Sequence, residues 1–240
     1  MRILALHGFG GNPSDWDFLK ARGLSVEALS LDGFSRLDLW DAGRAVCNFA
    51  RESREQQVLL GYSLGARLAL HALLLEPELF RAACFVSVNL GLATESARRA
   101  REQQDEIWAR EFEQEPWESV RKRWNDQPVF RGSRPRTEWE TLETGYPWER
   151  AVLVRQMRNF SLGRQAFLAG RLAAGKRTLP RMLFVAGEHD AKFRALLPPP
   201  DGERVRTEVL AGAGHRAPFD VPELFASRFT SFLYAANRAS

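Results

Sequence analysis

The sequence predicts an α/β protein in which helices flank a mainly parallel sheet, and two observations lead to this fold class. Short apolar runs alternate along the chain with longer segments of helical periodicity, which is the pattern of βαβ units. Several of the runs are also continuously apolar, as expected of strands that are buried on both faces of a parallel sheet.

Six runs qualify as strands, and at least two segments between or after them qualify as helices. The length of 240 residues suits one large domain with a substantial core. The candidate strands are Ile3–Leu6, Val26–Leu31, Gln57–Leu60, Ala83–Val88, Met182–Ala186 and Val205–Leu210. The candidate helices include Gly65–Leu75 and Pro222–Ala235.

One long stretch interrupts this alternation. Residues 90–179 contain no convincing strand and are rich in Arg, Glu, Trp and Gln. A connection of that length without structure of its own is uncommon in a compact domain. We therefore predict a core formed by residues 1–89 and 180–240, with residues 90–179 as a helical lid inserted between two core strands. Such an insertion lies at the edge of a parallel sheet where ligands bind.

Composition argues against several classes of partner. The net charge of +4 arises from 34 basic and 30 acidic residues that are mixed along the chain, and no basic block interleaves with aromatic residues. We therefore expect no nucleic-acid partner. No apolar run approaches the length of a membrane span, and the chain starts directly in a candidate strand, so we expect a cytoplasmic protein without a membrane partner. Cys47 and Cys84 belong to no close Cys/His cluster, so no metal site is predicted.

The strongest motif is Gly61-Tyr62-Ser63-Leu64-Gly65, which lies between a candidate strand and a candidate helix. A tight strand–turn–helix of this kind needs small residues on either side of the serine, and it raises the hydroxyl above the sheet. The motif predicts that Ser63 is a nucleophile at the end of the third strand.

A serine of this type requires a histidine and an orienting carboxylate. In chain order the acid should come next and the histidine last. Gly187-Glu188-His189-Asp190 follows the fifth candidate strand, and Gly212-Ala213-Gly214-His215 follows the sixth. We predict the triad Ser63, Asp190 and His215. Glu188 is the alternative acid, but Asp190 lies further into the loop.

A glycine-rich loop after the first strand completes the predicted site. It reads His7-Gly8-Phe9-Gly10-Gly11, and it is placed to supply a backbone amide to an oxyanion hole. The predicted donors are the N–H groups of Phe9 and Leu64. The turn at Gly61–Gly65, called the elbow below, follows a candidate strand, and so do the acid, the histidine and this loop. Together these four features predict the α/β-hydrolase fold. Of the remaining histidines, His71 is interpreted as structural and His189 as exposed.

Several segments across the chain resemble those of one family in particular, the 2-succinyl-6-hydroxy-2,4-cyclohexadiene-1-carboxylate (SHCHC) synthases of menaquinone biosynthesis. They are Leu6–Gly11 with Asp15-Trp16, Gly61–Arg67, Trp124 with Gln127–Phe130, Gly187–Phe193 and Ala213–His215. This chain departs from the family after the predicted catalytic histidine, where it reads Arg216-Ala217-Pro218-Phe219 without the further histidine often found there.

The resemblance implies a lyase that eliminates pyruvate from a cyclohexene bearing several carboxylates. In such enzymes the triad makes the serine basic, so that it removes a proton, and the oxyanion hole stabilises the developing negative charge. No metal or organic cofactor is implied. The partner is then a small polycarboxylate substrate. The oligomeric state is left open, with a monomer as the simplest expectation.

The resemblance also implies substrate-binding residues, since arginines form strong charge-assisted bonds to carboxylates. By position, Arg67 and Arg101 match substrate-binding arginines, although Arg98 and Arg99 compete with Arg101 for that role. A third arginine is expected later in the lid, and Arg150 is the candidate. The full implied set is Tyr62, Arg67, Arg101, Trp124, Phe130 and Arg150.

Two other functions remain open at this point. The same triad would serve a hydrolase that cleaves a carboxylic ester or a C–C bond in a diketone. The arginines favour a polyanionic substrate, whereas a general esterase more often has an apolar pocket. A non-catalytic binding protein on the same scaffold is disfavoured, because the predicted triad and its oxyanion loop are complete.

Overall fold

The computed structural model describes residues 1–54, 56–134, 147–175 and 178–238. Six strands form one sheet in the order β2-β1-β3-β4-β5-β6, and every neighbouring pair is parallel. The strands are β1 (Ile3–Leu6), β2 (Val26–Leu29), β3 (Gln57–Tyr62), β4 (Phe80–Val86), β5 (Arg181–Gly187) and β6 (Val205–Leu210). All six predicted strands and the predicted fold class are confirmed.

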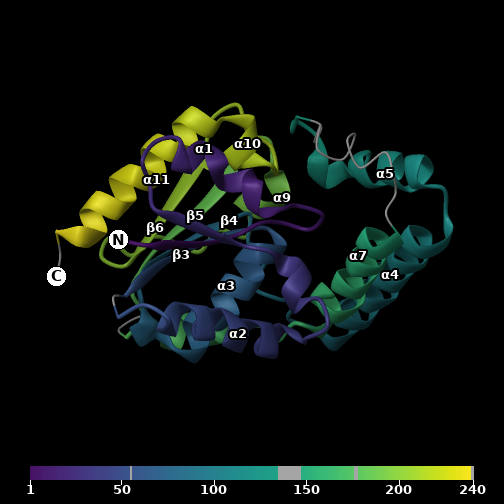
Figure 1. The fold of residues 1–240 in the computed structure, drawn as a ribbon, viewed down its shortest axis with the longest axis horizontal. Coiled ribbons are helices and arrows are strands. Elements are labelled where there is room, and N and C mark those ends of the chain that lie inside the picture. The colour runs from purple at the N-terminus through teal and green to yellow at the C-terminus, as the bar shows by residue number, and fades with distance from the viewer. Residues whose placement is uncertain (55, 135–146, 176–177, 239–240) are drawn as a thin grey trace.

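Helices cover both faces of the sheet (Figure 1). On one face lie α2 (Leu39–Arg51), α3 (Leu64–Leu75) and α8 (Ala169–Ala174), and on the other lie α1 (Asp17–Lys20), α10 (Ala217–Asp220) and α11 (Pro222–Asn237). Alternate residues of each strand pack on opposite faces, as the period of two requires. In β1, for example, Leu4 packs on the α2–α3 side and Ile3 on the α11 side.

A layer of helices, called the lid below, stands beyond the carboxyl ends of the strands (Figure 1). It contains α4 (Glu95–Gln114), α5 (Trp117–Asn125) and α7 (Pro147–Asn159). Thr94 begins α4 by accepting a hydrogen bond from the Ala97 N–H at 3.2 Å, which is the usual role of a threonine at this position. Phe112, Leu153 and Met157 belong to a small apolar cluster of the lid's own.

Not all of the predicted insertion at 90–179 lies in this layer. The segment that contains α8 returns to the main core, where Leu168, Leu172 and Leu179 pack with residues of α2 and α3. Apolar burial explains the placement, since these three leucines are almost fully buried beneath the sheet. The lid helices that face the predicted site therefore end before α8 begins.

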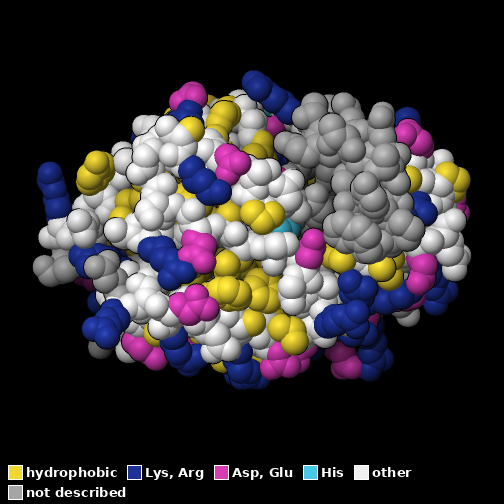
Figure 2. Space-filling view, viewed as in Figure 1, with side chains coloured by type: hydrophobic (Ala, Val, Ile, Leu, Met, Phe, Trp, Pro, Cys, Tyr) yellow, Lys and Arg dark blue, Asp and Glu magenta, His cyan; other side chains and the backbone are white. Residues whose placement is uncertain are grey.

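The remaining elements are short. Helix α9 (Ala191–Arg194) follows β5, and 3-10 turns occur at Pro13–Trp16, Leu31–Phe34, Pro77–Leu79, Pro128–Phe130 and Leu162–Arg164. Over the described ranges, no helix is both long enough and apolar enough to cross a bilayer. Basic and acidic side chains are interspersed on the face seen in Figure 2, as the mixed charge pattern of the sequence leads one to expect.

Candidate active site

Ser63 occupies the sharp turn between β3 and α3. Its φ of 52° and ψ of −109° lie outside the usual regions for a residue with a side chain, which is the strained geometry of a nucleophile elbow. The flanking glycines allow the turn to close. A Cβ on Gly61 would lie 2.5 Å from Ala66 Cα, and a Cβ on Gly65 would lie 2.3 Å from the His7 carbonyl oxygen. The sequence spacing is therefore a packing requirement.

The three side chains of the predicted triad lie within hydrogen-bond distance of one another. Ser63 Oγ is 3.1 Å from His215 Nε2, and His215 Nδ1 is 2.7 Å from Asp190 Oδ2. Asp190 and His215 are each 3% exposed. Asp190 also accepts a hydrogen bond from the Phe193 N–H at the start of α9. Glu188, the alternative acid, is exposed and instead accepts from the Gly212 N–H at 2.8 Å.

His215 is held in place by contacts on several sides. The Ser87 hydroxyl donates to the His215 carbonyl oxygen at 3.1 Å. Ring centroids of Phe193, Phe130 and Tyr62 lie 4.6, 5.7 and 5.7 Å from the imidazole. Because the backbone and the ring are both restrained, the imidazole is oriented before any ligand binds.

The glycine-rich loop after β1 lies beside Ser63, and the His7 side chain stabilises it through two hydrogen bonds. The buried His7 ring accepts a hydrogen bond from the Leu31 N–H at Nε2, 3.1 Å away, so Nδ1 carries the proton and donates to the Gly8 carbonyl oxygen at 2.8 Å. Phe9 and Leu64 both line the cavity above Ser63. Leu64 is the first residue of α3, where a backbone N–H has no partner within the helix.

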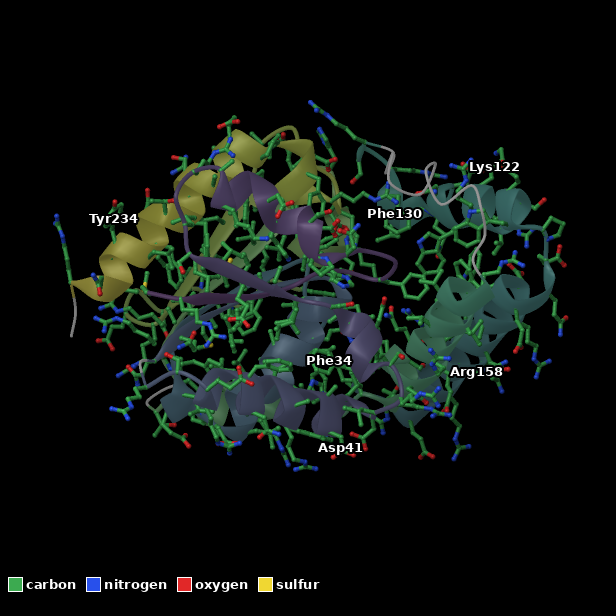
Figure 3. The ribbon with its side chains drawn as sticks, in the orientation of Figure 1. Phe34, Asp41, Lys122, Phe130, Arg158 and Tyr234 are labelled. Atoms are coloured by element: carbon green, nitrogen blue, oxygen red, sulfur yellow. The ribbon has the colours of Figure 1, made fainter. Side chains whose placement is uncertain are left out.

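A cavity of about 620 Å³ opens above Ser63 between the core and the lid, a size typical of small-molecule sites. Much of its wall is aromatic, and it also carries four cationic side chains. The aromatic residues are Phe9, Trp108, Trp124, Phe130, Phe160 and Phe193, and the cations are Arg67, Arg101, Arg131 and Lys192. Figure 3 shows Phe130 where the lid meets the core.

Arg67 is the most deeply buried of these cations, with 8% of its surface exposed. Its Nε donates to the side-chain oxygen of Gln165, and its Nη2 has no hydrogen-bond partner. Burial, together with the nearby charge of Arg101, lowers the pKa of Arg67 to about 9, although Asp105 acts in the opposite direction. At neutral pH the site therefore holds a buried positive charge that is only partly satisfied.

Arg101 approaches the cavity from α4. Its Nε donates to Asp105 Oδ1 at 2.7 Å. The other oxygen of Asp105 accepts from the Ser161 hydroxyl at 2.7 Å and from the Leu162 N–H at 3.3 Å. The two competing arginines lie elsewhere: Arg98 donates to the Leu92 carbonyl oxygen and Arg99 pairs with Glu95, and neither lines the cavity.

Two residues of the implied substrate-binding set do not reach the cavity. The ring of Tyr62 is buried behind it, against His215 and Phe219, because a residue just before the elbow still points into the sheet–helix layer. Arg150 donates to the Glu115 carbonyl oxygen, and its guanidinium lies 5.8 Å above the Trp117 ring. These contacts hold Arg150 against the junction of α4 and α5, and it does not line the cavity. Arg67, Arg101, Trp124 and Phe130 all line the cavity.

Sequence reasoning missed Lys192 and Arg131. Lys192 lies at an exposed part of the wall, where partial burial of its ammonium group and the charge of Arg101 lower its pKa. Its signal was its position two residues after the predicted acid, Asp190. Arg131 directly follows the turn that contains Phe130, and no sequence pattern distinguished it from the many other arginines of the chain.

The other histidines have different surroundings. His71 is buried in α3 and its Nδ1 donates to the Arg67 carbonyl oxygen at 2.7 Å. Burial lowers the pKa of His71 to about 4, so its ring is neutral at physiological pH. His189 is exposed at the edge of the cavity.

The described part of the chain contains no cluster of three or more His, Cys, Asp or Glu side chains suited to a metal ion. Cys47 and Cys84 are both buried free thiols.

Comparison with known proteins places the chain in a family. The model of the "Alpha/beta hydrolase family" matches residues 3–228. The chain is 31% identical to proteins named 2-succinyl-6-hydroxy-2,4-cyclohexadiene-1-carboxylate synthase from Yersinia pseudotuberculosis serotype O:3 (strain YPIII) and Yersinia pestis (strain Pestoides F). Each alignment covers 96% of this chain and 86% of the relative.

Solved structures show the same fold. MenH from S. aureus superposes with a TM-score of 0.75 at 17% identity, over 99% of this chain and 94% of that one. The Cif epoxide hydrolase from Acinetobacter nosocomialis superposes with a TM-score of 0.72 at 12% identity, over 97% and 82% of the two chains. From the family match and the curated relatives together, we conclude that this chain is an enzyme of the alpha/beta hydrolase family and belongs, within it, with the SHCHC synthases.

Proposed function

We propose that this enzyme is a pyruvate-eliminating lyase that converts SEPHCHC, the enolpyruvyl precursor of SHCHC, into SHCHC in menaquinone biosynthesis. Four cations line the cavity above Ser63, and this is the observation that carries the proposal. A substrate with several carboxylates would satisfy them, because charge-assisted bonds to carboxylates are strong where water is excluded. The curated relatives carry the name of this activity.

In the proposed mechanism Ser63 is the base. Its hydroxyl proton passes to His215 Nε2, 3.1 Å away, and Asp190 stabilises the resulting imidazolium through Nδ1. Ser63 Oγ then takes a proton from a ring carbon of SEPHCHC. The electron pair left behind leads to a second ring C=C bond and breaks the C–O bond to the side chain, which departs as the enolate of pyruvate. The His215 imidazolium gives this enolate the proton it took from Ser63, so both residues return to their starting states.

The loop and the elbow would assist this step through their backbone. The N–H groups of Phe9 and Leu64 are the proposed oxyanion hole, which would stabilise negative charge as it spreads onto a substrate oxygen. Arg67 and Arg101 would bind substrate carboxylates, with Trp124 and Phe130 against the ring. No step calls for a metal ion or an organic cofactor.

A hydrolase with Ser63 as nucleophile is the second candidate. The strained elbow favours it, since a hydroxyl raised by this turn can also attack a carbonyl carbon. The triad would serve either reaction. The two functions differ in the substrate they need, because a neutral ester would leave the buried charge of Arg67 without a counter-charge.

The two functions are separated by an absorbance assay with SEPHCHC, run beside a neutral p-nitrophenyl ester and repeated with Ser63→Ala and Arg67→Ala. We expect loss of SEPHCHC with equimolar pyruvate release and little ester hydrolysis. Ser63→Ala should lower the rate by about 10³-fold or more. Arg67→Ala should impair SEPHCHC turnover far more than any ester turnover.

Two results would contradict the proposal. Ester turnover with inert SEPHCHC would assign the chain to the hydrolases. Near-normal SEPHCHC turnover by Ser63→Ala would remove Ser63 from the mechanism.

A further inference from the structure

Behind the cavity wall, a neutral side chain holds the buried cation of Arg67. Gln165 is 1% exposed and does not itself line the cavity. Its oxygen accepts from Arg67 Nε, and its Nε2 donates to the Asn89 carbonyl oxygen at 2.9 Å. The orientation of the amide is unambiguous, because the arginine can only donate and the carbonyl can only accept.

The choice of an amide at this position is unusual in electrostatic terms. A buried arginine is normally paired with a carboxylate that compensates its desolvation. The nearby carboxylate, Asp105, is committed by its hydrogen bonds to Arg101, Ser161 and the Leu162 N–H. Arg67 Nη2 has no partner at all. The positive charge of Arg67 is thus oriented but left without a hydrogen-bonded counter-charge.

We propose that Gln165 is a positioning residue that orients Arg67 toward a substrate carboxylate and leaves the positive charge of Arg67 available to that carboxylate. The proposal rests on the proposed function in one respect only, namely that the ligand is a polycarboxylate. With Nε engaged behind the wall and Nη2 itself buried, Nη1 is the terminal nitrogen left for the ligand. An acceptor is needed to hold the guanidinium in this direction, and a neutral acceptor is needed so that the substrate does not compete with an internal ion pair.

Two substitutions of Gln165 separate its effect on the orientation of Arg67 from the effect of its neutral charge. Gln165→Glu retains an oxygen acceptor for Arg67 Nε but adds a negative charge that neutralises the guanidinium. Gln165→Met retains the length of the side chain but removes the acceptor without adding charge. Gln114→Glu is the matched control, because Gln114 ends α4 at an exposed position outside the cavity and its substitution changes the net charge equally.

The primary measurement is the Kd of tricarballylate, a non-reacting tricarboxylate, determined by titration calorimetry on the full-length protein. We expect Gln165→Glu to weaken binding about tenfold or more, the scale of one charge-assisted hydrogen bond. Gln165→Met should weaken it by a smaller factor, and Gln114→Glu by less than about twofold. In SEPHCHC turnover both Gln165 variants should raise KM more than they lower kcat, a split that general loss of structure would not produce.

Several outcomes would overturn the inference. Tricarballylate binding by Gln165→Glu that equals the wild type would show that the neutrality of Gln165 is irrelevant, and equal binding by Gln165→Met would show the same for the acceptor. If Gln165→Glu does not fold, Gln165→Met decides the matter. Wild-type protein that binds tricarballylate but leaves SEPHCHC intact would refute the proposed function alone, whereas wild-type protein that does not bind tricarballylate would refute this inference.

Discussion

At the scale of single residues, Asp190 and Glu188 show how burial separates two carboxylates of one loop. Asp190 is buried and contacts His215 Nδ1 at 2.7 Å, while Glu188 is exposed and caps the Gly212 N–H. A buried carboxylate next to the imidazole selects its tautomer and stabilises the imidazolium. An exposed one two residues away does neither.

Asp190→Asn should therefore lower kcat/KM for SEPHCHC by about 10³- to 10⁴-fold, since the amide favours the wrong imidazole tautomer. Glu188→Gln is the matched control and should remain within about threefold of the wild type. Steady-state kinetics at pH 7 measures both. A loss below tenfold in Asp190→Asn, or equal losses in the two variants, would contradict the assignment of the acid.

His71 gives a prediction for stability. Burial lowers its pKa from 6.5 to about 4 in the folded protein. Between these two values the unfolded chain binds a proton that the folded chain does not, so stability falls as the pH is lowered from about 6.5 to about 4. The loss attributable to His71 should approach 3 kcal/mol on an order-of-magnitude basis.

Urea unfolding of the wild type and of His71→Gln across this pH range tests the point. The variant keeps a donor for the Arg67 carbonyl oxygen but cannot titrate, so its stability should depend less on pH. Parallel curves for the two proteins would show that His71 is not the titrating group.

At the scale of elements, hydrogen bonds join the lid to the loop that carries the predicted catalytic histidine. Arg216 donates to the Arg134 carbonyl oxygen at 2.9 Å and to Asn125 Oδ1 at 2.6 Å, and its guanidinium lies 4.3 Å above the Phe130 ring. Asp220 adds hydrogen bonds from the Arg134 N–H and the Gly214 N–H. Arg216, the residue after His215, thus holds the aromatic wall of the cavity against this loop.

Arg216→Ala should loosen this arm of the lid while leaving the sheet intact. Hydrogen exchange of residues 124–134 should accelerate, and KM for SEPHCHC should rise about tenfold, because two charge-assisted hydrogen bonds and a cation–π contact are lost. Arg123→Ala is the control, since Arg123 is an exposed lid arginine paired with Glu111. Unchanged hydrogen exchange in residues 124–134 would show that Arg216 does not hold this segment of the lid.

At the scale of the whole molecule, basic and acidic side chains are interspersed on the surface seen in Figure 2, whereas cations outnumber carboxylates on the cavity wall. The cavity wall brings together cations from α3, α4, the turn after α5 and α9: Arg67, Arg101, Arg131 and Lys192. On the outer side of the lid, by contrast, Arg158 is compensated by Glu106 and Glu113 (Figure 3). Ligand affinity should accordingly depend on the charge state of the wall.

The affinity for tricarballylate should decrease as the pH rises through about 9, because the Arg67 guanidinium loses its proton with a pKa of about 9 and Lys192 titrates below its ordinary range. Affinity decreases, and does not increase, because the cavity loses positive charge that attracts the anion. Calorimetric titrations from pH 7 to pH 10 measure the trend, with Arg131→Ala as a comparison that retains both groups. A constant Kd up to pH 10 would contradict it.

Much of this molecule follows from local patterns in the chain. The central strands β1, β3, β4 and β5 could be predicted because burial on both faces requires largely apolar runs. The elbow could be predicted because Gly61 and Gly65 leave no room for a Cβ. The position of Ser63, Asp190 and His215 at one edge of the sheet could also be predicted, since each follows a strand whose carboxyl end lies at that edge.

Other features depended on how distant segments pack. The chain alone could not show that Tyr62 and Arg150 turn away from the cavity, that α8 returns to the core, or that Lys192 and Arg131 join the wall. In a lid of amphipathic helices with many arginines, the direction of each side chain is set by the partner helix and not by its own neighbours in sequence. The orientation of Arg67 by Gln165, 98 residues away along the chain, is a contact that only the packed lid and core create.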